Sequence, residues 1–152
     1  MLKVVLFEPE IAGNVGSIIR SCVCFNSELH IIEPCGFPFD IKRIKKSALD
    51  YIDNISIYRH SCFANFVDYK NQQHPQSRII VASTKSSQNL FDFKFTAEDF
   101  VIFGKESSGL PEYIHQIADA RLRIEMLNNQ RSLNLAVSSA IFLAKANNDF
   151  AK

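Results

Sequence analysis

The feature that most constrains the fold is an alternation between short, almost continuously apolar segments and longer segments with a helical period. The apolar segments are rich in Val, Ile, Leu and Phe, and they predict strands at residues 2–7, 28–33, 54–58, 78–83, 99–104 and 120–126. Predicted helices lie between them at residues 14–25, 41–50, 61–71, 111–117 and 131–148. Because several strands are apolar on both faces, we expect an α/β fold with a mainly parallel sheet and helices on both faces.

The length and composition fit one globular domain that spans residues 1–152. The chain of 152 residues can bury one proper core but is too short for two ordinary domains, and its 47% apolar and 22% charged residues exclude disorder. The opening "MLKVVLFEPE" is interrupted by acids and a proline, so it predicts a first strand and not a signal peptide. No apolar stretch approaches the roughly 18 residues of a membrane span. We therefore expect a cytoplasmic protein.

The cysteines are irregularly spaced and form no CxxC pair. A metal site or disulfides are conceivable, but reduced and mostly buried thiols are the better interpretation in a cytoplasmic chain. The four residues are Cys22, Cys24, Cys35 and Cys62.

The positive charge of the chain is local. The net charge is only +1, which gives no general attraction to nucleic acid, yet "DIKRIKKSALDY" places four basic residues within five positions. They are Lys42, Arg43, Lys45 and Lys46. A solvated helix face and a patch that contacts phosphates both stay open as interpretations of this basic run.

The last predicted helix, residues 131–148, is apolar around most of its circumference in "RSLNLAVSSAIFLAKANNDF". A helix of this kind must be covered on most sides, and a domain of this size covers one face. The remaining face predicts a homodimer that packs through this helix.

The first of three notable loops is "EPEIAGNVGSIIRSC", residues 8–22. Glycines at the start of a helix let backbone amides approach an anion, and the helix dipole favours negative charge there. Asn14 is a plausible helix cap, and Arg20 follows nearly two turns after Gly13, on about the same side as Gly13 and Asn14. The pattern is neither GxGxxG nor a P-loop, so a dinucleotide fingerprint is absent.

Two further loops follow later strands. In "FGKESSGLP", residues 103–111, Gly104 stands at the carboxyl end of a predicted parallel strand, where open α/β sheets bind ligands. Glu106 in the same loop could simply cap the next helix. In "RIEMLNNQRSLNLAVSSA", residues 123–140, Ser132 and Asn134 are ordinary capping residues at the start of the apolar helix.

Each loop alone is a weak signal, but the three together are specific. The patterns N-x-G-x-x-x-R, F-G-x-E-x-x-G-L-P and R-S-L-N-L resemble, in this order, the three motifs of the SpoU–TrmD (SPOUT) class of RNA methyltransferases. The resemblance covers nearly the whole chain. "EPEIAGNVGSIIR", "LHIIEPCGF" and "DIKRIKKSALDY" are similar in particular to the short tRNA wobble-nucleotide 2′-O-methyltransferases.

The resemblance implies a fold, a reaction and a cofactor site. It implies a C-terminal trefoil knot and transfer of a methyl group from S-adenosyl-L-methionine to a ribose 2′-hydroxyl, at the wobble cytidine or uridine of tRNA. The cofactor would be held largely by backbone groups, and a glycine at position 104 would let it come close. The implied cofactor-binding residues are Ala82, Gly104, Ile124, Met126, Ser132 and Leu133.

The resemblance also implies roles for polar residues. Arg20 matches the proposed catalytic arginine, and Glu106 and Asn134 would order the loops around the cofactor. The basic run would contact the phosphates of the tRNA anticodon stem-loop. No metal is needed, because the methyl donor is already activated. The family dimer brings two chains to one site, so Arg20 of one chain could act on cofactor bound by the other.

Three positions depart from the family pattern, which usually has Arg at Ser108, Pro at Glu125 and Ser at Ala136. These departures leave open a homologue that binds RNA or cofactor without turnover. A methyltransferase for another tRNA site or for ribosomal RNA is a second alternative. A small flavodoxin-like nucleotide binder is a third, although the first loop lacks the phosphate-binding pattern that it would need.

Overall fold

A computed structural model describes residues 1–128 and 130–152. Its strands form one seven-stranded sheet in the order β3-β2-β1-β6-β4-β7-β5, and all strand pairs are parallel. The strands are β1 (Lys3–Phe7), β2 (Glu28–Ile32), β3 (Ile57–His60), β4 (Ile79–Ala82), β5 (Gln88–Asn89), β6 (Phe100–Phe103) and β7 (Ala120–Arg123). The helices are α1 (Ala12–Cys24), α2 (Ile41–Ala48), α3 (Phe63–Gln73), α4 (Glu112–Ile117) and α5 (Leu135–Phe150), with 3₁₀ helices η1 (Leu49–Asn54) and η2 (Leu90–Asp92).

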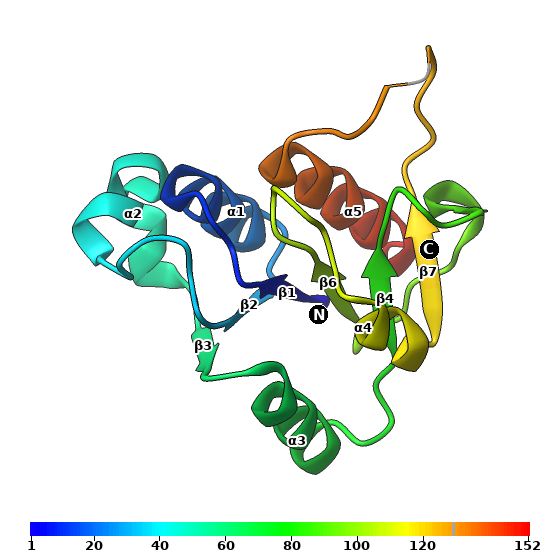
Figure 1. Cartoon of the computed structure of the whole chain (residues 1–152), viewed down its shortest axis with the longest axis horizontal. Helices are drawn as coiled ribbons and strands as arrows, with labels where there is room; N and C mark the ends of the chain where they lie inside the picture. Colours follow the sequence, from blue (N-terminus) through cyan, green and yellow to red (C-terminus); the bar gives the residue numbers. More distant parts are fainter. Residues whose placement is uncertain (129) are drawn as a thin grey trace.

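Helices cover both faces of the sheet (Figure 1). Because successive side chains of a strand point to opposite faces, Val4 and Leu6 of β1 pack with α1, α2 and α5, whereas Val5 and Phe7 pack with α3 and α4. Every residue of β1 and β6 is buried. The α/β class and the parallel sheet predicted from the continuous apolar segments are therefore confirmed.

Several predicted boundaries are wrong. The third strand was expected at residues 54–58 but begins at Ile57, because Asn54 ends η1. The two-residue strand β5 has no apolar run that would reveal it. The last helix, expected at 131–148, begins at Leu135 because Asn134 caps it, and it ends at Phe150.

The expectation that all four thiols are mostly buried is only partly correct. Cys22 is buried, and burial raises the pKa of its thiol to about 12. Cys24 and Cys62 are exposed, and the four thiols are free. Within residues 1–128 and 130–152, no group of three or more His, Cys, Asp or Glu side chains is placed to hold a metal ion, and no helix is long and apolar enough to cross a membrane.

Candidate functional site

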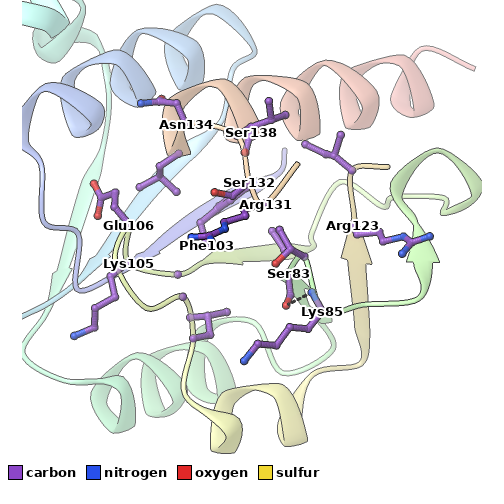
Figure 2. A pocket seen from close by; sticks show the side chains of 18 of the residues that line it. Ser83, Lys85, Phe103, Lys105, Glu106, Arg123, Arg131, Ser132, Asn134 and Ser138 are labelled. Atoms are coloured by element: carbon purple, nitrogen blue, oxygen red, sulfur yellow. Dashed lines mark hydrogen bonds between the residues drawn. The ribbon is translucent and has the colours of Figure 1, made fainter. Parts of the chain in front are cut away.

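The carboxyl ends of four neighbouring strands, β1, β6, β4 and β7, meet at one edge of the sheet and surround a cavity (Figure 2). Its volume of about 510 Å³ lies in the range of small-molecule sites. The walls come from the segments that follow β4, β6 and β7 and from the segment that leads into α5. Ile11 and Asn14 at the start of α1 complete it.

The structure brings all six predicted cofactor-binding residues to this one cavity. They lie on four separate segments of the chain, which only the folded sheet brings together. The residues are Ala82, Gly104, Ile124, Met126, Ser132 and Leu133. Glu106 and Asn134 also line the cavity, so eight of the nine residues predicted for cofactor binding and catalysis share one site.

Glu106 joins the second loop to the start of α1. Its carboxylate accepts hydrogen bonds from the backbone N–H groups of Glu10 at 2.9 Å and Ile11 at 3.2 Å, and from the Asn14 side-chain amide at 3.1 Å. The N-cap residue of α1, Ile11, offers no side-chain cap, and Glu106 instead holds the backbone of Glu10 and Ile11 just before the helix begins. The prediction that Asn14 caps α1 is wrong, because Asn14 is the third residue of the helix and its side chain bonds to Glu106 and Asn134.

Asn134 extends the same network to the last helix. Its side-chain oxygen accepts from the backbone N–H groups of Ala136 and Val137 and caps α5, as predicted. Its side-chain nitrogen donates to the Asn14 oxygen at 3.1 Å. The three loops singled out in the sequence are thus connected through the chain Glu106–Asn14–Asn134.

A second set of contacts fixes the first loop against the second. The Ser107 hydroxyl and backbone N–H both donate to the Glu10 carboxylate, and the hydroxyl contact holds the pKa of Glu10 below its usual value. Lys105 Nζ lies 2.6 Å from the Glu8 carboxylate. Because both loops are bound to each other at several points, the cavity wall on this side is preformed.

Gly104 has a structural role in addition to the predicted one. A Cβ atom at this position would lie 2.4 Å from the carbonyl carbon of Gly109, far inside the van der Waals limit. The two residues approach because Lys105 and Gly109 form an antiparallel bridge that closes the loop. The missing side chain therefore makes room for the backbone of the loop itself, which in turn shapes the cavity.

Arg20 does not lie in the cavity. Six residues separate it from Asn14, which corresponds to about 240° around the helix, so the two side chains point in different directions. The expectation that both lie on the same side is wrong. The Arg20 side chain is exposed, and its guanidinium carbon lies 5.6 Å from the centre of the Tyr51 ring.

The basic run is an exposed face of α2, outside the cavity of a single chain. Its four members are Lys42, Arg43, Lys45 and Lys46. Lys45 lies 3.7 Å from the Asp53 carboxylate, and both side chains are mostly in solvent, where such a pair contributes little.

Two of the three departures from the family pattern lie away from the cavity walls. Glu125 accepts a hydrogen bond from Asn89 and lies 3.7 Å from Arg123. Ala136 packs against the core of the α1–α5 face. Only Ser108 lines the cavity.

Several polar residues of the cavity were not among the predicted site residues. Ser83, Thr84 and Lys85 follow β4, and the rule that ligands bind at strand ends could have identified them. His115 of α4 is also in the wall, and burial lowers the pKa of its imidazole. Nothing in the sequence pattern around His115 indicates this position.

The fold and the cavity define a class: an α/β domain with a parallel sheet and a ligand site built from loops at its carboxyl edge. The chain belongs to the SpoU rRNA Methylase family, which it matches over residues 1–144.

Individual relatives agree with this membership. The chain is 39% identical over 145 residues to a tRNA (cytidine(34)-2′-O)-methyltransferase from Ancylobacter novellus, covering 95% of this chain and 90% of the relative. It is also similar to a solved structure described as "Structural insights into the 2-OH methylation of C/U34 on tRNA", with a TM-score of 0.94, 32% identity and coverage of 99% and 97% of the two chains. The SpoU methyltransferase AviRb from Streptomyces viridochromogenes, solved with AdoMet, shares the fold at a TM-score of 0.92 and 22% identity, over 100% of this chain and 58% of AviRb.

Proposed function

We propose that this protein is an S-adenosyl-L-methionine-dependent tRNA 2′-O-methyltransferase that acts on the wobble nucleotide, cytidine or uridine 34. One observation carries the proposal: the three loops that resemble the family motifs enclose a single cavity and are hydrogen-bonded to one another through Asn14. The relatives that match nearly the full chain are methyltransferases for this tRNA position.

The cavity fits an amphipathic nucleoside. Its wall combines apolar side chains such as Leu110, Leu122 and Phe142 with hydroxyl groups and the main chain of strand ends. The backbone groups of the six predicted residues, Ala82, Gly104, Ile124, Met126, Ser132 and Leu133, would hold the cofactor. S-adenosyl-L-methionine, when bound, supplies a methyl group that is already activated on a sulfonium.

The protein then needs to align the ribose 2′-hydroxyl with the methyl group and to allow the hydroxyl proton to leave. A guanidinium group is not a general base in proteins, so we assign Arg20 the binding of a phosphate or the orientation of the 2′-hydroxyl. Glu106 and Asn134 order the loops and do not touch the reacting atoms, because their polar atoms already bond to Asn14 and to backbone N–H groups.

The substrate would be the anticodon stem-loop of tRNA. Its unstacked bases are the form of RNA that proteins read most readily. The exposed face of α2, with Lys42, Arg43, Lys45 and Lys46, would contact phosphates, and binding would weaken as salt concentration rises. A tRNA substrate agrees with the cytoplasmic location expected from the sequence.

The active form would be a homodimer that packs through α5. Val137, 49% exposed, lies on the side of α5 that faces away from the core, and Ala144, two turns further, is exposed as well. Because Arg20 is outside the cavity of its own chain, a second chain would bring an Arg20 to it. The trefoil knot remains a proposal, supported by the 131–135 segment, which lines the same cavity as the loops after β4 and β6. We also propose that residues 1–152 act as one domain, since α5 packs against α1.

The function can be tested with an anticodon stem-loop that carries ribose or 2′-deoxyribose at position 34. Radioactive methyl from S-adenosyl-L-methionine should enter only the ribose substrate. Equal labelling of both substrates would mean that the enzyme methylates a nucleotide other than 34. Absence of labelling on this stem-loop and on whole tRNA, together with measurable cofactor binding, would favour the homologue without turnover.

A further inference from the structure

The Arg20 side chain rests on an aromatic ring and has no acidic partner in the part of the chain that the structure describes. Its guanidinium carbon lies 5.6 Å from the centre of the Tyr51 ring, within the distance of a cation–π contact. Two other arginines stack on rings, but each also pairs with a carboxylate: Arg59 with Glu33 and Arg78 with Asp99. None of the ion pairs or side-chain hydrogen bonds among residues 1–128 and 130–152 involves Arg20.

The close packing of α1 against α2 places the Tyr51 ring next to Arg20. A Cβ at Gly16 would lie 2.6 Å from the Ile44 carbonyl oxygen, so only glycine allows α1 to approach α2 this closely. Arg20 follows Gly16 by four residues, about one turn, and therefore stands over the segment after α2. That segment is η1, which is anchored in the core by the buried Ile52 and carries the half-buried Tyr51 next to it.

We propose that Tyr51 is a positioning residue for Arg20: its ring face holds the guanidinium in place by a cation–π contact and leaves the N–H groups free for the RNA. A long side chain loses rotamer freedom when it binds an anion, and a guanidinium that is already held against a ring loses less. An ion pair with a protein carboxylate would compete with the substrate, whereas a ring face does not occupy the donors. The inference rests on the proposed function, since it assigns the ring-bound Arg20 to the transfer step.

The position of Tyr51 also suits an approach of RNA. It lies directly after α2, whose exposed face carries the basic run, and α1 and α2 lie side by side (Figure 1). A phosphate chain drawn to the basic run would therefore pass close to the Arg20 donors.

Three variants separate the role of the ring from that of the hydroxyl and of packing. Tyr51→Phe keeps the ring face, and Tyr51→Leu keeps apolar bulk but removes the ring. We expect Tyr51→Leu to lower kcat for tRNA about tenfold and Tyr51→Phe to stay within about twofold of the original chain, as the strength of such contacts allows. The KM for S-adenosyl-L-methionine should not change. Phe39→Leu, which removes the ring under Arg59, is the matched control and should leave kcat unchanged.

A double-mutant cycle shows whether Tyr51 acts through Arg20. In an Arg20→Ala background, Tyr51→Leu should cause no further loss of kcat. An equal tenfold loss in both backgrounds, or a loss in Tyr51→Phe as large as in Tyr51→Leu, would overturn the proposal.

A nuclear magnetic resonance measurement decides the contact without any activity. The ring should shift the Arg20 Nε–H proton upfield in the original chain and in Tyr51→Phe, and Tyr51→Leu should remove this shift. The same proton position in all three chains would overturn the proposal. If the original chain shows the shift but transfers no methyl group, the proposed function is wrong, whereas the contact between Tyr51 and Arg20 stands.

Discussion

The side-chain nitrogen of Asn134 donates a hydrogen bond to the side-chain oxygen of Asn14 at 3.1 Å, across 120 positions of the chain. Asn14 in turn donates to Glu106, so one amide connects the start of α1, the loop after β6 and the start of α5. This relationship explains why three loops that are separately unremarkable in sequence act as one site. It also places the polar motif residues in a supporting role around the cavity.

The carboxylate of Glu106 should be needed for the shape of the cavity. In Glu106→Gln, one of the two acceptor oxygens becomes a donor that faces backbone N–H groups. We expect a loss of about 1–3 kcal/mol in the free energy of unfolding, measured by urea denaturation. The matched control is Glu125→Gln, at a carboxylate that is 58% exposed, which should change this value by less than about 0.5 kcal/mol. Equal stability of the two variants would contradict the assigned role.

Gly104 should not tolerate even the smallest side chain. In Gly104→Ala, the added methyl group would overlap the backbone of Gly109, so we expect a loss of about 1–3 kcal/mol of stability in thermal unfolding. Gly13→Ala is the matched control, because the position is helical and the added group would meet no atom within 4 Å beyond its chain neighbours and the backbone of its own helix. It should stabilise the chain by up to about 1 kcal/mol. A neutral Gly104→Ala would show that the loop is not closed as described.

The strands could be predicted from the sequence, whereas the structural role of Gly104 could not. The continuous apolar runs of β1 and β6 identify strands buried on both faces, and from them follow the parallel sheet and the edge at which ligands bind. The function of Gly104 depends on the approach of Gly109, which requires the loop to be folded first. The same holds for Glu106, whose partners are 92 to 96 positions away.

Two other features, the contact of Arg20 with Tyr51 and the strand β5, could not be predicted from sequence patterns. The rotation of Arg20 away from Asn14 follows from helix geometry, but its contact with Tyr51 depends on how α1 packs against α2. The two-residue strand β5 is defined only by its pairing with β7. In contrast, the six cofactor-binding residues predicted from the family motifs line one cavity, since the motif order encodes the strand ends.

A buried pair of histidines outside the site should make the fold sensitive to acid. His30 Nδ1 lies 3.0 Å from His60 Nε2, and burial, followed by the charges of His60, His74 and Lys3, lowers the pKa of His30 from 6.5 to about 3. The unfolded chain therefore binds more protons than the folded chain between these values. Stability is full above about pH 6.5 and should fall by about 1.4 kcal/mol for each pH unit below it.

Urea denaturation between pH 4 and 8 checks this dependence. In His30→Phe, one proton fewer should be taken up on unfolding between pH 4 and 6.5, so the slope of the free energy of unfolding against pH should decrease by about 1.4 kcal/mol per pH unit. The absolute stability of the variant does not affect the comparison. An unchanged slope would mean that His30 is not the group that titrates.

The exposed apolar face of α5 should mediate self-association. Val137→Glu places a charge at the centre of the proposed interface, and sedimentation at micromolar concentration should change from a dimer to a monomer. Asn147→Glu, at an exposed position of the same helix, is the control and should leave the dimer intact. Sedimentation of the original chain as a monomer would contradict the proposed interface.

Calorimetric titration of S-adenosyl-L-methionine into the original chain and into Ser138→Phe tests the central claim most directly. Ser138 lies on α5 in the cavity wall (Figure 2), and a phenylalanine there would occupy part of the cavity. We predict one cofactor bound per original chain and binding at least tenfold weaker in the variant. No binding to the original chain, or equal affinity in the two chains, would contradict the assignment of the cavity as the cofactor site.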